Sequence, residues 1–104
     1  MIRKRRRPRF AELVDRQLDF FDEDHAGLVH DTEAALAAYT SSPRDEAEER
    51  YGDFVDLVDA GRDALEEIRD TYARTLDEDA DEEYRMTFND HARKRFPRFG
   101  FELD

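Results

Sequence analysis

The chain has 104 residues, of which 43% are charged and 38% hydrophobic, and its formal net charge is −11. This length allows one domain with a single modest core. The absence of cysteine excludes disulfides and cysteine-ligated metal sites as supports for that core. No stretch approaches the roughly 20 consecutive apolar residues that span a bilayer. We therefore expect a cytoplasmic protein without a membrane span.

The charges are unevenly distributed along the chain. Residues 1–9 carry six basic groups, residues 93–98 carry four, and residues 10–92 hold 26 acidic against 7 basic residues. The sequence is thus an acidic body, with a net charge of −19, between a basic N-terminal arm (1–9) and an aromatic C-terminal tail (96–104). A body of this charge repels polyanions beyond about 8 Å, the Debye length at physiological salt. The pattern therefore argues against broad nucleic-acid binding.

The first predicted element is a long helix over residues 10–41, a segment that contains no proline. Its apolar or small residues recur at gaps of three and four, which places one narrow stripe along a helix. The stripe comprises Ala11, Val14, Leu18, Phe21, His25, Leu28, Thr32, Ala35 and Tyr39.

A second helix of similar length is predicted over residues 43–77, with Ser42 as its N-cap and Pro43 at its first position. Two helices of about 32 residues joined by a short turn predict an antiparallel hairpin. With the turn near Ser42, the ring of Phe21 would face Gly61, where the missing side chain lets the backbones approach. The stripe of this helix comprises Ala47, Tyr51, Phe54, Val58, Gly61, Leu65, Ile68, Tyr72 and Leu76.

A short third helix is predicted over residues 80–95, after an acidic run. Asp79 and Glu82 have the spacing of a capping box, and the basic last turn suits the helix dipole. Proline at position 97 ends the helix, and the apolar side chains of the tail 96–104 are expected to dock on another surface. The apolar stripe of this helix comprises Tyr84, Phe88 and Ala92.

Taken together, the elements predict an all-α fold, a long antiparallel helical hairpin with a short third helix. Several apolar residues flank the two stripes without a partner inside the hairpin: Phe20, Val29, Leu36, Val55 and Leu57. A second copy, as in a four-helix bundle, or a partner protein would supply the missing cover. The alternative is a monomeric three-helix bundle, in which the third helix and the tail fold back over these residues.

The stripes and the chain ends therefore supply two sets of candidate contact residues. The predicted assembly interface comprises Leu18, Phe21, Leu28, Phe54, Val58, Leu65 and Ile68. A further partner would meet the basic and aromatic residues of the two ends, Arg5, Arg6, Arg7, Arg95, Phe99 and Phe101. The same basic ends could instead pair with the acidic body of their own chain or of a neighbouring copy.

One acidic segment has the spacing of a calcium-binding loop. Residues 22–33 place aspartate at loop positions one and three, glycine at six, an aliphatic residue at eight and glutamate at twelve. Residues 20–36 thus resemble an EF-hand, and the resemblance implies Asp22, Asp24 and Glu33 as calcium ligands. Alanine at position five supplies no side-chain oxygen. The competing interpretation is that this segment is a solvated part of one continuous helix.

The remaining chemistry-bearing residues form no catalytic pattern. His25 fits the helix stripe, and its pairing with Asp22 lacks the second copy that di-iron sites in helix bundles require. The sequence contains neither a glycine-rich phosphate loop nor a recognisable nucleophile with its base. We therefore expect a non-enzymatic interaction or scaffold protein without a cofactor, and a calcium-binding module is the alternative.

Overall fold

The computed structural model describes residues 9–100 and residue 103. This part of the chain contains helices and no strands, so the predicted all-α class is confirmed. The molecule is elongated, with principal extents of 60 × 35 × 22 Å. The helices are α1 (Ala11–Asp24), α2 (Ala26–Thr40), α3 (Ala47–Ala73), α4 (Glu78–Arg95) and α5 (Pro97–Gly100).

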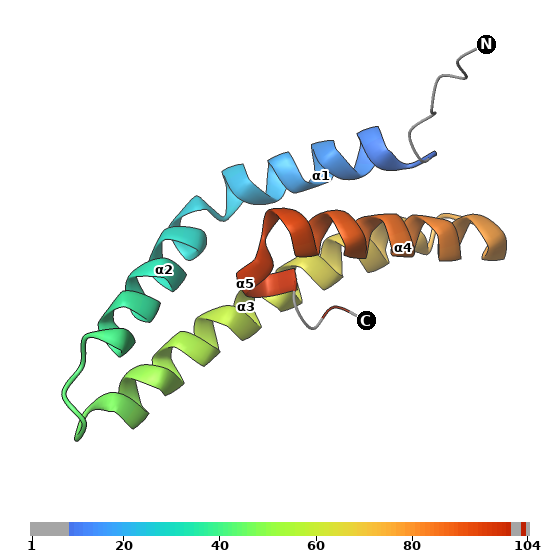
Figure 1. Ribbon diagram of the computed structural model, residues 1–104. Coiled ribbons are helices and arrows are strands. Elements are labelled where there is room, and N and C mark those ends of the chain that lie inside the picture. Colours follow the sequence, from blue (N-terminus) through green and yellow to red (C-terminus); the bar gives the residue numbers. More distant parts are fainter. Residues whose placement is uncertain (1–8, 101–102, 104) are drawn as a thin grey trace, which may run out of the picture.

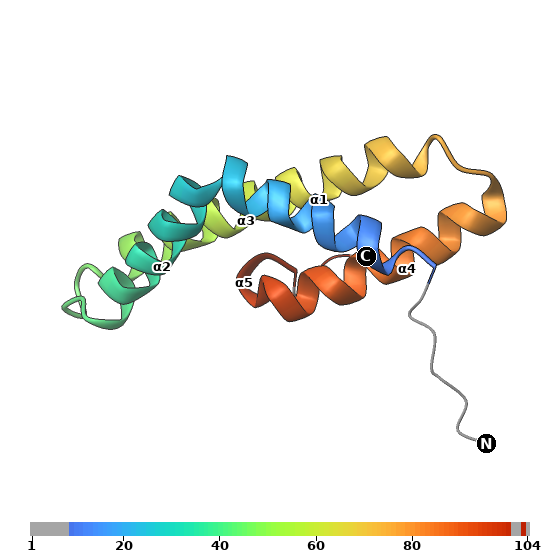
Figure 2. The ribbon, with the colours of Figure 1, turned by 90° about the horizontal axis from the view of Figure 1, so that it is seen from above.

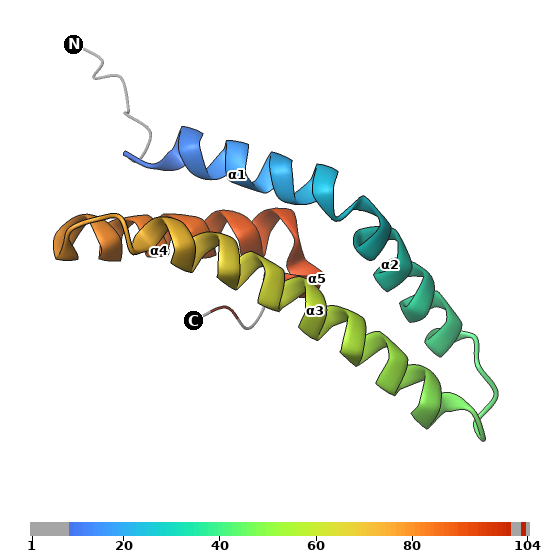
Figure 3. The same cartoon turned by 180° about the vertical axis from the view of Figure 1, so that it is seen from behind.

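The helices form two connected parts, which we call the body and the hairpin. In the body, α1 and α4 pack with the C-terminal half of α3. In the hairpin, α2 packs antiparallel along the N-terminal half of α3 and extends past the end of α4 (Figures 1 and 3). The view from above shows the same extension, with α5 close to the point where the two parts meet (Figure 2). The long helix α3 is thus shared by both parts.

The predicted single helix over residues 10–41 is wrong at one position. Helix α1 ends at Asp24 and α2 begins at Ala26, with His25 between them at φ −119° and ψ 27°. Gly27 follows, and glycine is among the weakest helix formers, so an interruption costs little here. The break lets α1 follow α4 while α2 follows α3.

The turn between α2 and α3 also differs from the prediction of a helix starting at Pro43. Helix α3 begins only at Ala47, and residues 43–46 form a turn in which Glu46 N–H donates to the Pro43 carbonyl. Ser42 Oγ donates to the Tyr39 carbonyl at 2.8 Å. Ser42 therefore satisfies the C-terminal end of α2 instead of capping α3, and the second helix is shorter than residues 43–77.

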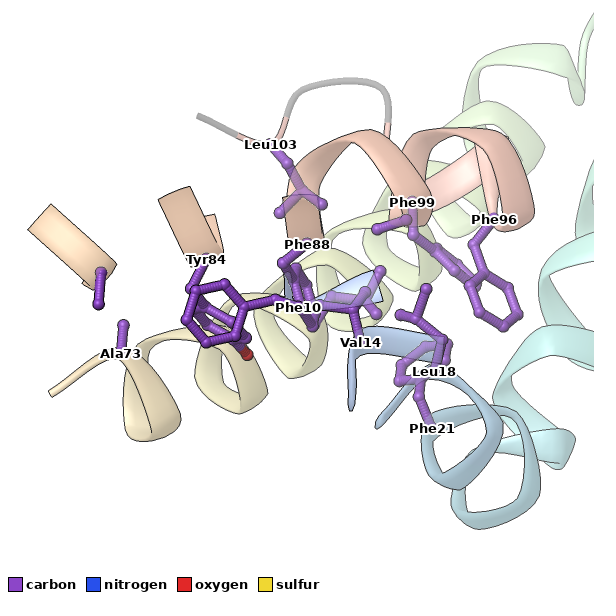
Figure 4. Close-up of a cluster of buried hydrophobic side chains, with 13 residues drawn as sticks. Phe10, Val14, Leu18, Phe21, Ala73, Tyr84, Phe88, Phe96, Phe99 and Leu103 are labelled. Carbon is purple, nitrogen blue, oxygen red and sulfur yellow. The ribbon is translucent and has the colours of Figure 1, made fainter. Parts of the chain in front are cut away.

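Helix α4 starts near the predicted position but with a different cap. The Asp77 side chain accepts a hydrogen bond from Ala80 N–H at 2.9 Å, so Asp77 and not Asp79 is the N-cap. The predicted stripe of α4 is confirmed, because Tyr84, Phe88 and Ala92 are all fully buried. Figure 4 shows Tyr84 and Phe88 within the cluster of buried side chains that forms the core.

The C-terminal tail docks on the chain itself, as one of the sequence-based alternatives anticipated. Helix α5 presses the Phe99 ring onto Gly61 of α3, where a Cβ atom would overlap the ring. Gly61 is buried, as predicted, but the ring that packs against it belongs to Phe99 and not to the predicted Phe21. Phe21 packs one layer away, with its ring centroid 5.9 Å from that of Phe99. Leu103 is also buried in the core.

Candidate docking surface

The most informative surface feature is an apolar stripe on α3 that is covered over only half of its length. The stripe recurs at gaps of three and four, so its members share one face of the helix. In the body, Leu65, Arg69 and Ala73 are buried on this face, and Arg69 reaches α4 by donating to Asn89 at 2.9 Å. In the hairpin the same face continues beyond the end of α4, as Tyr51, Val55, Val58 and Arg62.

This uncovered half of the stripe forms the floor of a groove of about 210 Å³. Its apolar residues are exposed or half-buried, in contrast to the fully buried Leu65. Helix α5 closes the groove at the end nearest the body, where Phe99 and Arg98 contribute to the lining. The lining residues are Tyr51, Phe54, Val55, Val58, Asp59, Arg62, Arg98 and Phe99.

Aromatic side chains gather near the tip of the hairpin, close to the turn between α2 and α3. The Tyr51 ring lies between Tyr39 of α2 and Phe54 of α3, with centroid separations of 5.1 Å and 6.4 Å. Tyr51 is nevertheless 50% exposed. Aromatic side chains carry a large apolar area, and Tyr51 and Phe54 contribute it to the lining of the groove.

Charged pairs flank the end of the groove nearest the body. Arg62 donates to Asp59 at 2.7 Å, and Arg98 of α5 meets Glu33 of α2 at 3.2 Å. These pairs hold two guanidinium groups beside the apolar floor. The groove therefore combines an apolar centre with charged groups in fixed positions at one end.

The structure divides the predicted assembly residues into two groups. Leu18, Phe21 and Leu65 are 0% exposed and belong to the core of their own chain, so they are not available to a second molecule. This part of the prediction is wrong because α4 and α5 cover the positions that a partner was expected to cover. Leu28, Phe54, Val58 and Ile68 are only half-buried.

The half-buried residues do not all lie in one place. Phe54 and Val58 line the groove of the hairpin. Ile68 instead lines a wider, more open depression of about 550 Å³ between α1 and α3, together with Tyr72 and His25. Val55, which the sequence placed beside the stripe, is among the residues that line the groove.

The residues predicted to meet a further partner serve mainly inside the chain. Phe99 is only 3% exposed, so it packs mainly inside its own chain and only borders the groove. Arg95 Nη1 lies 2.6 Å from the Asp19 carboxylate, which ties α4 to α1. The C-terminal basic cluster thus pairs with the acidic body of its own chain. The other predicted contacts lie outside the described residues, namely Arg5, Arg6, Arg7 and Phe101.

The segment that resembles an EF-hand is helical on both sides of His25. Asp22 and Asp24 lie in the last turn of α1, whereas Glu33 lies in α2 and is engaged by Arg98. A twelve-residue calcium loop has a different backbone, so the loop prediction is wrong. Residues 9–100 and 103 contain no group of three or more His, Asp or Glu side chains placed to hold a metal ion.

Titratable groups with shifted pKa values lie between α3 and α4, away from the groove. Burial raises the pKa of Tyr84 to about 12. Burial alone would also raise the pKa of the Asp70 carboxyl, but hydrogen bonds from Arg69 and Arg85 lower it below its usual value. Hydrogen bonds to Asp81 and Asp70 raise the pKa of Arg85. These shifts follow from the packing of α4 on α3.

No protein-family model, curated protein or solved structure matches this chain. None of the helices in the described part of the chain is both long and apolar enough to cross a membrane.

Proposed function

We propose that this chain is a non-enzymatic interaction protein, which associates with a second copy or with a partner protein through the groove of its hairpin. The observation that supports this proposal is the half-covered stripe of α3. One helix face carries mostly apolar side chains, interrupted by Arg62 and Arg69, and it is buried in the body but only partly buried in the hairpin.

The energetics favour a docked occupant. Transfer of a Val or Phe side chain from exposure to full burial contributes about 1.5 to 3 kcal/mol. Phe54, Val55 and Val58 realise only part of this contribution in the isolated chain, because each stays half-buried. A helix lying in the groove would complete their burial, as the surrounding core does for Leu65 and Ala73.

Site-specific photocrosslinking tests this function. Benzoylphenylalanine replaces Tyr51 in the groove in one variant and Phe20 on α1 in the other. Phe20 is a matched control, because it is an exposed aromatic residue outside the lining of the groove. Both variants are irradiated in cells of the native host, and the attached segments are mapped by mass spectrometry.

We expect the Tyr51 variant to attach to one apolar helical segment that the Phe20 variant does not label. Absence of such an adduct at Tyr51, with circular dichroism showing that the variant folds, would contradict the proposed function. The identity of the attached segment decides between a second copy and a different protein.

A further inference from the structure

The C-terminal tail enters the core of the body with three apolar anchors. Phe96, Phe99 and Leu103 are almost fully buried, and Figure 4 shows all three side chains pointing from the tail into the core cluster. Two of the anchors meet Phe21 of α1, whose ring centroid lies 4.9 Å from that of Phe96 and 5.9 Å from that of Phe99. The tail is therefore seated in a site that the rest of the chain provides.

The fit between the tail and this site depends on two missing side chains, one on each side of the contact. Gly61 of α3 leaves free the space that the Phe99 ring fills. Gly100 of the tail lies so close to α4 that a Cβ atom there would come within 2.7 Å of the Ala92 carbonyl oxygen. The site thus selects an aromatic ring followed directly by glycine, and it is specific in shape as well as apolar.

The tail is nevertheless a small and separable part of the structure. Helix α5 has four residues, too few to be stable as an isolated helix. Arg98 ties it to Glu33 of α2, but both side chains of this pair are about half exposed, and exposed ion pairs contribute little. Ten of the thirteen buried residues in the core cluster belong to residues 10–92. The core is therefore formed mainly without the tail.

We propose that the site beneath the tail is a peptide-binding site, which the chain's own tail occupies and which accepts the same pattern from a partner protein. The pattern is an aromatic residue, a second aromatic residue three positions later and a glycine directly after it, as in Phe96, Phe99 and Gly100. The seated tail supplies the chemistry of the partner segment. This inference goes beyond the proposed function, because the groove meets the site only at its border, at Phe99.

Covalent attachment gives the tail an advantage over a free peptide that makes the same contacts. A ligand attached through a short flexible connection is present at an effective concentration in the millimolar range, and the tail follows α4 directly. A partner segment at micromolar concentration therefore enters the site only when the tail is weakened or when its own contacts are stronger. The tail acts as an autoinhibitory segment.

Binding of a labelled peptide to variants of the full chain tests the inference. The peptide has the sequence of residues 95–104, with a fluorophore at its N-terminus, and fluorescence anisotropy follows titrations that reach millimolar concentration. Phe99→Ala removes a buried ring from the attached tail, which should weaken its docking by about a hundredfold or more. We expect this variant to bind the peptide at least tenfold more tightly than the original chain does.

Glycine substitutions locate the bound peptide. Gly61→Ala, added to the Phe99→Ala variant, should weaken peptide binding by about tenfold, because the new Cβ atom takes the space of the peptide's ring. Gly52→Ala is the matched control in the same helix, since a Cβ atom there meets no neighbour, and it should leave peptide binding unchanged. A peptide with alanine in place of the phenylalanine that corresponds to Phe99 should not bind.

A surface substitution provides a second test that leaves the core intact. Arg98→Glu places a negative charge beside Glu33 and should raise the affinity for the peptide a few-fold, because the attached tail is weakened. Circular dichroism checks that each variant folds. If Phe99→Ala does not fold, Arg98→Glu decides the question, and a peptide affinity equal to that of the original chain would then overturn the inference.

Two further outcomes would also overturn it. One is a folded Phe99→Ala variant that does not bind the peptide, which would show that the tail is a fixed part of the core. The other is equal peptide binding with and without Gly61→Ala, which would place the peptide elsewhere. Photocrosslinking at Tyr51 reports on the groove and not on this site, so the proposed function stands or fails independently.

Discussion

At the scale of single residues, the interface between α3 and α4 is held by buried polar side chains. Arg69 is buried and donates to Asn89 at 2.9 Å, while the Tyr84 hydroxyl donates to Gln17 of α1 at 2.7 Å. A buried polar group without a partner is costly, so these contacts restrict how α4 can lie on its neighbours. They make the interface specific as well as apolar.

Tyr84 gives a prediction for alkaline conditions. Its pKa is raised to about 12 in the folded chain and is about 10 in an unfolded chain. The folded state therefore retains this contribution to stability below pH 10 and loses it progressively as the pH rises from about 10 to 12. Because one pKa unit corresponds to about 1.4 kcal/mol, this difference between the folded and unfolded pKa values lowers the free energy of unfolding by about 2 to 3 kcal/mol.

Urea unfolding at a series of alkaline pH values measures this effect. The Tyr84→Phe variant lacks the titrating hydroxyl, so its unfolding free energy should fall less steeply over the same range. It should also be about 1 kcal/mol less stable near neutral pH, because the hydrogen bond to Gln17 is lost. Equal slopes for the two chains would show that the ionisation of Tyr84 is not linked to folding.

At the scale of elements, the contact between α5 and α3 depends on one missing side chain. Phe99 occupies the space beside Gly61 that a Cβ atom would need. At Gly52, in the same helix, the space around a Cβ is open. The two glycines therefore differ in their role, although both lie inside the continuous helix α3.

We predict opposite effects for the two glycine-to-alanine substitutions. Gly61→Ala should lower the unfolding free energy by about 1 to 3 kcal/mol, because the buried ring must shift. Gly52→Ala should raise it by up to about 1 kcal/mol, since alanine is the better helix former and meets no neighbour. Chemical denaturation of both variants, monitored by circular dichroism, compares them. Stabilisation by both substitutions would show that Phe99 is not held against Gly61.

Part of this architecture could be predicted from residue spacing. The gaps of three and four correctly identified Val14, Leu18 and Phe88 as inward-facing, because periodicity alone decides which face of a helix is apolar. The break at His25 could not be predicted, since it depends on two different neighbours for α1 and α2. Likewise, spacing marked Val55 as lacking a partner but could not show that α4 ends before reaching it.

At the scale of the whole molecule, the shape departs from that of a compact domain. The radius of gyration is 16.7 Å, whereas a compact domain of this length has about 13 Å. The excess comes from the hairpin, which projects from the body (Figure 1). An elongated chain keeps its acidic surface charges farther apart, which reduces their mutual repulsion.

The charge balance predicts how salt affects stability. Residues 10–92 carry a net charge of −19, and increasing the ionic strength from about 0.01 M to about 1 M shortens the Debye length from roughly 30 Å to 3 Å. The melting temperature should therefore rise with salt. Exposed pairs such as Arg98–Glu33 weaken in salt, but such pairs contribute little.

Thermal unfolding by circular dichroism, at a protein concentration low enough to keep the chain monomeric, measures this response. A melting temperature that falls with salt would show that the ion pairs of the C-terminal segment outweigh the repulsion within the acidic body.

Because the chain leaves the body at His25, the hairpin beyond it contributes little to the core. Leu18, Phe88 and Leu103 are buried in the body, and the hairpin residues 26–60 add no fully buried large apolar side chain to it. Seven residues added to α2 and seven to the N-terminal half of α3 would lengthen the arm by about 10 Å and preserve its face. The reach of this arm can therefore change in evolution or by design, in whole-heptad steps, with the body left as it is.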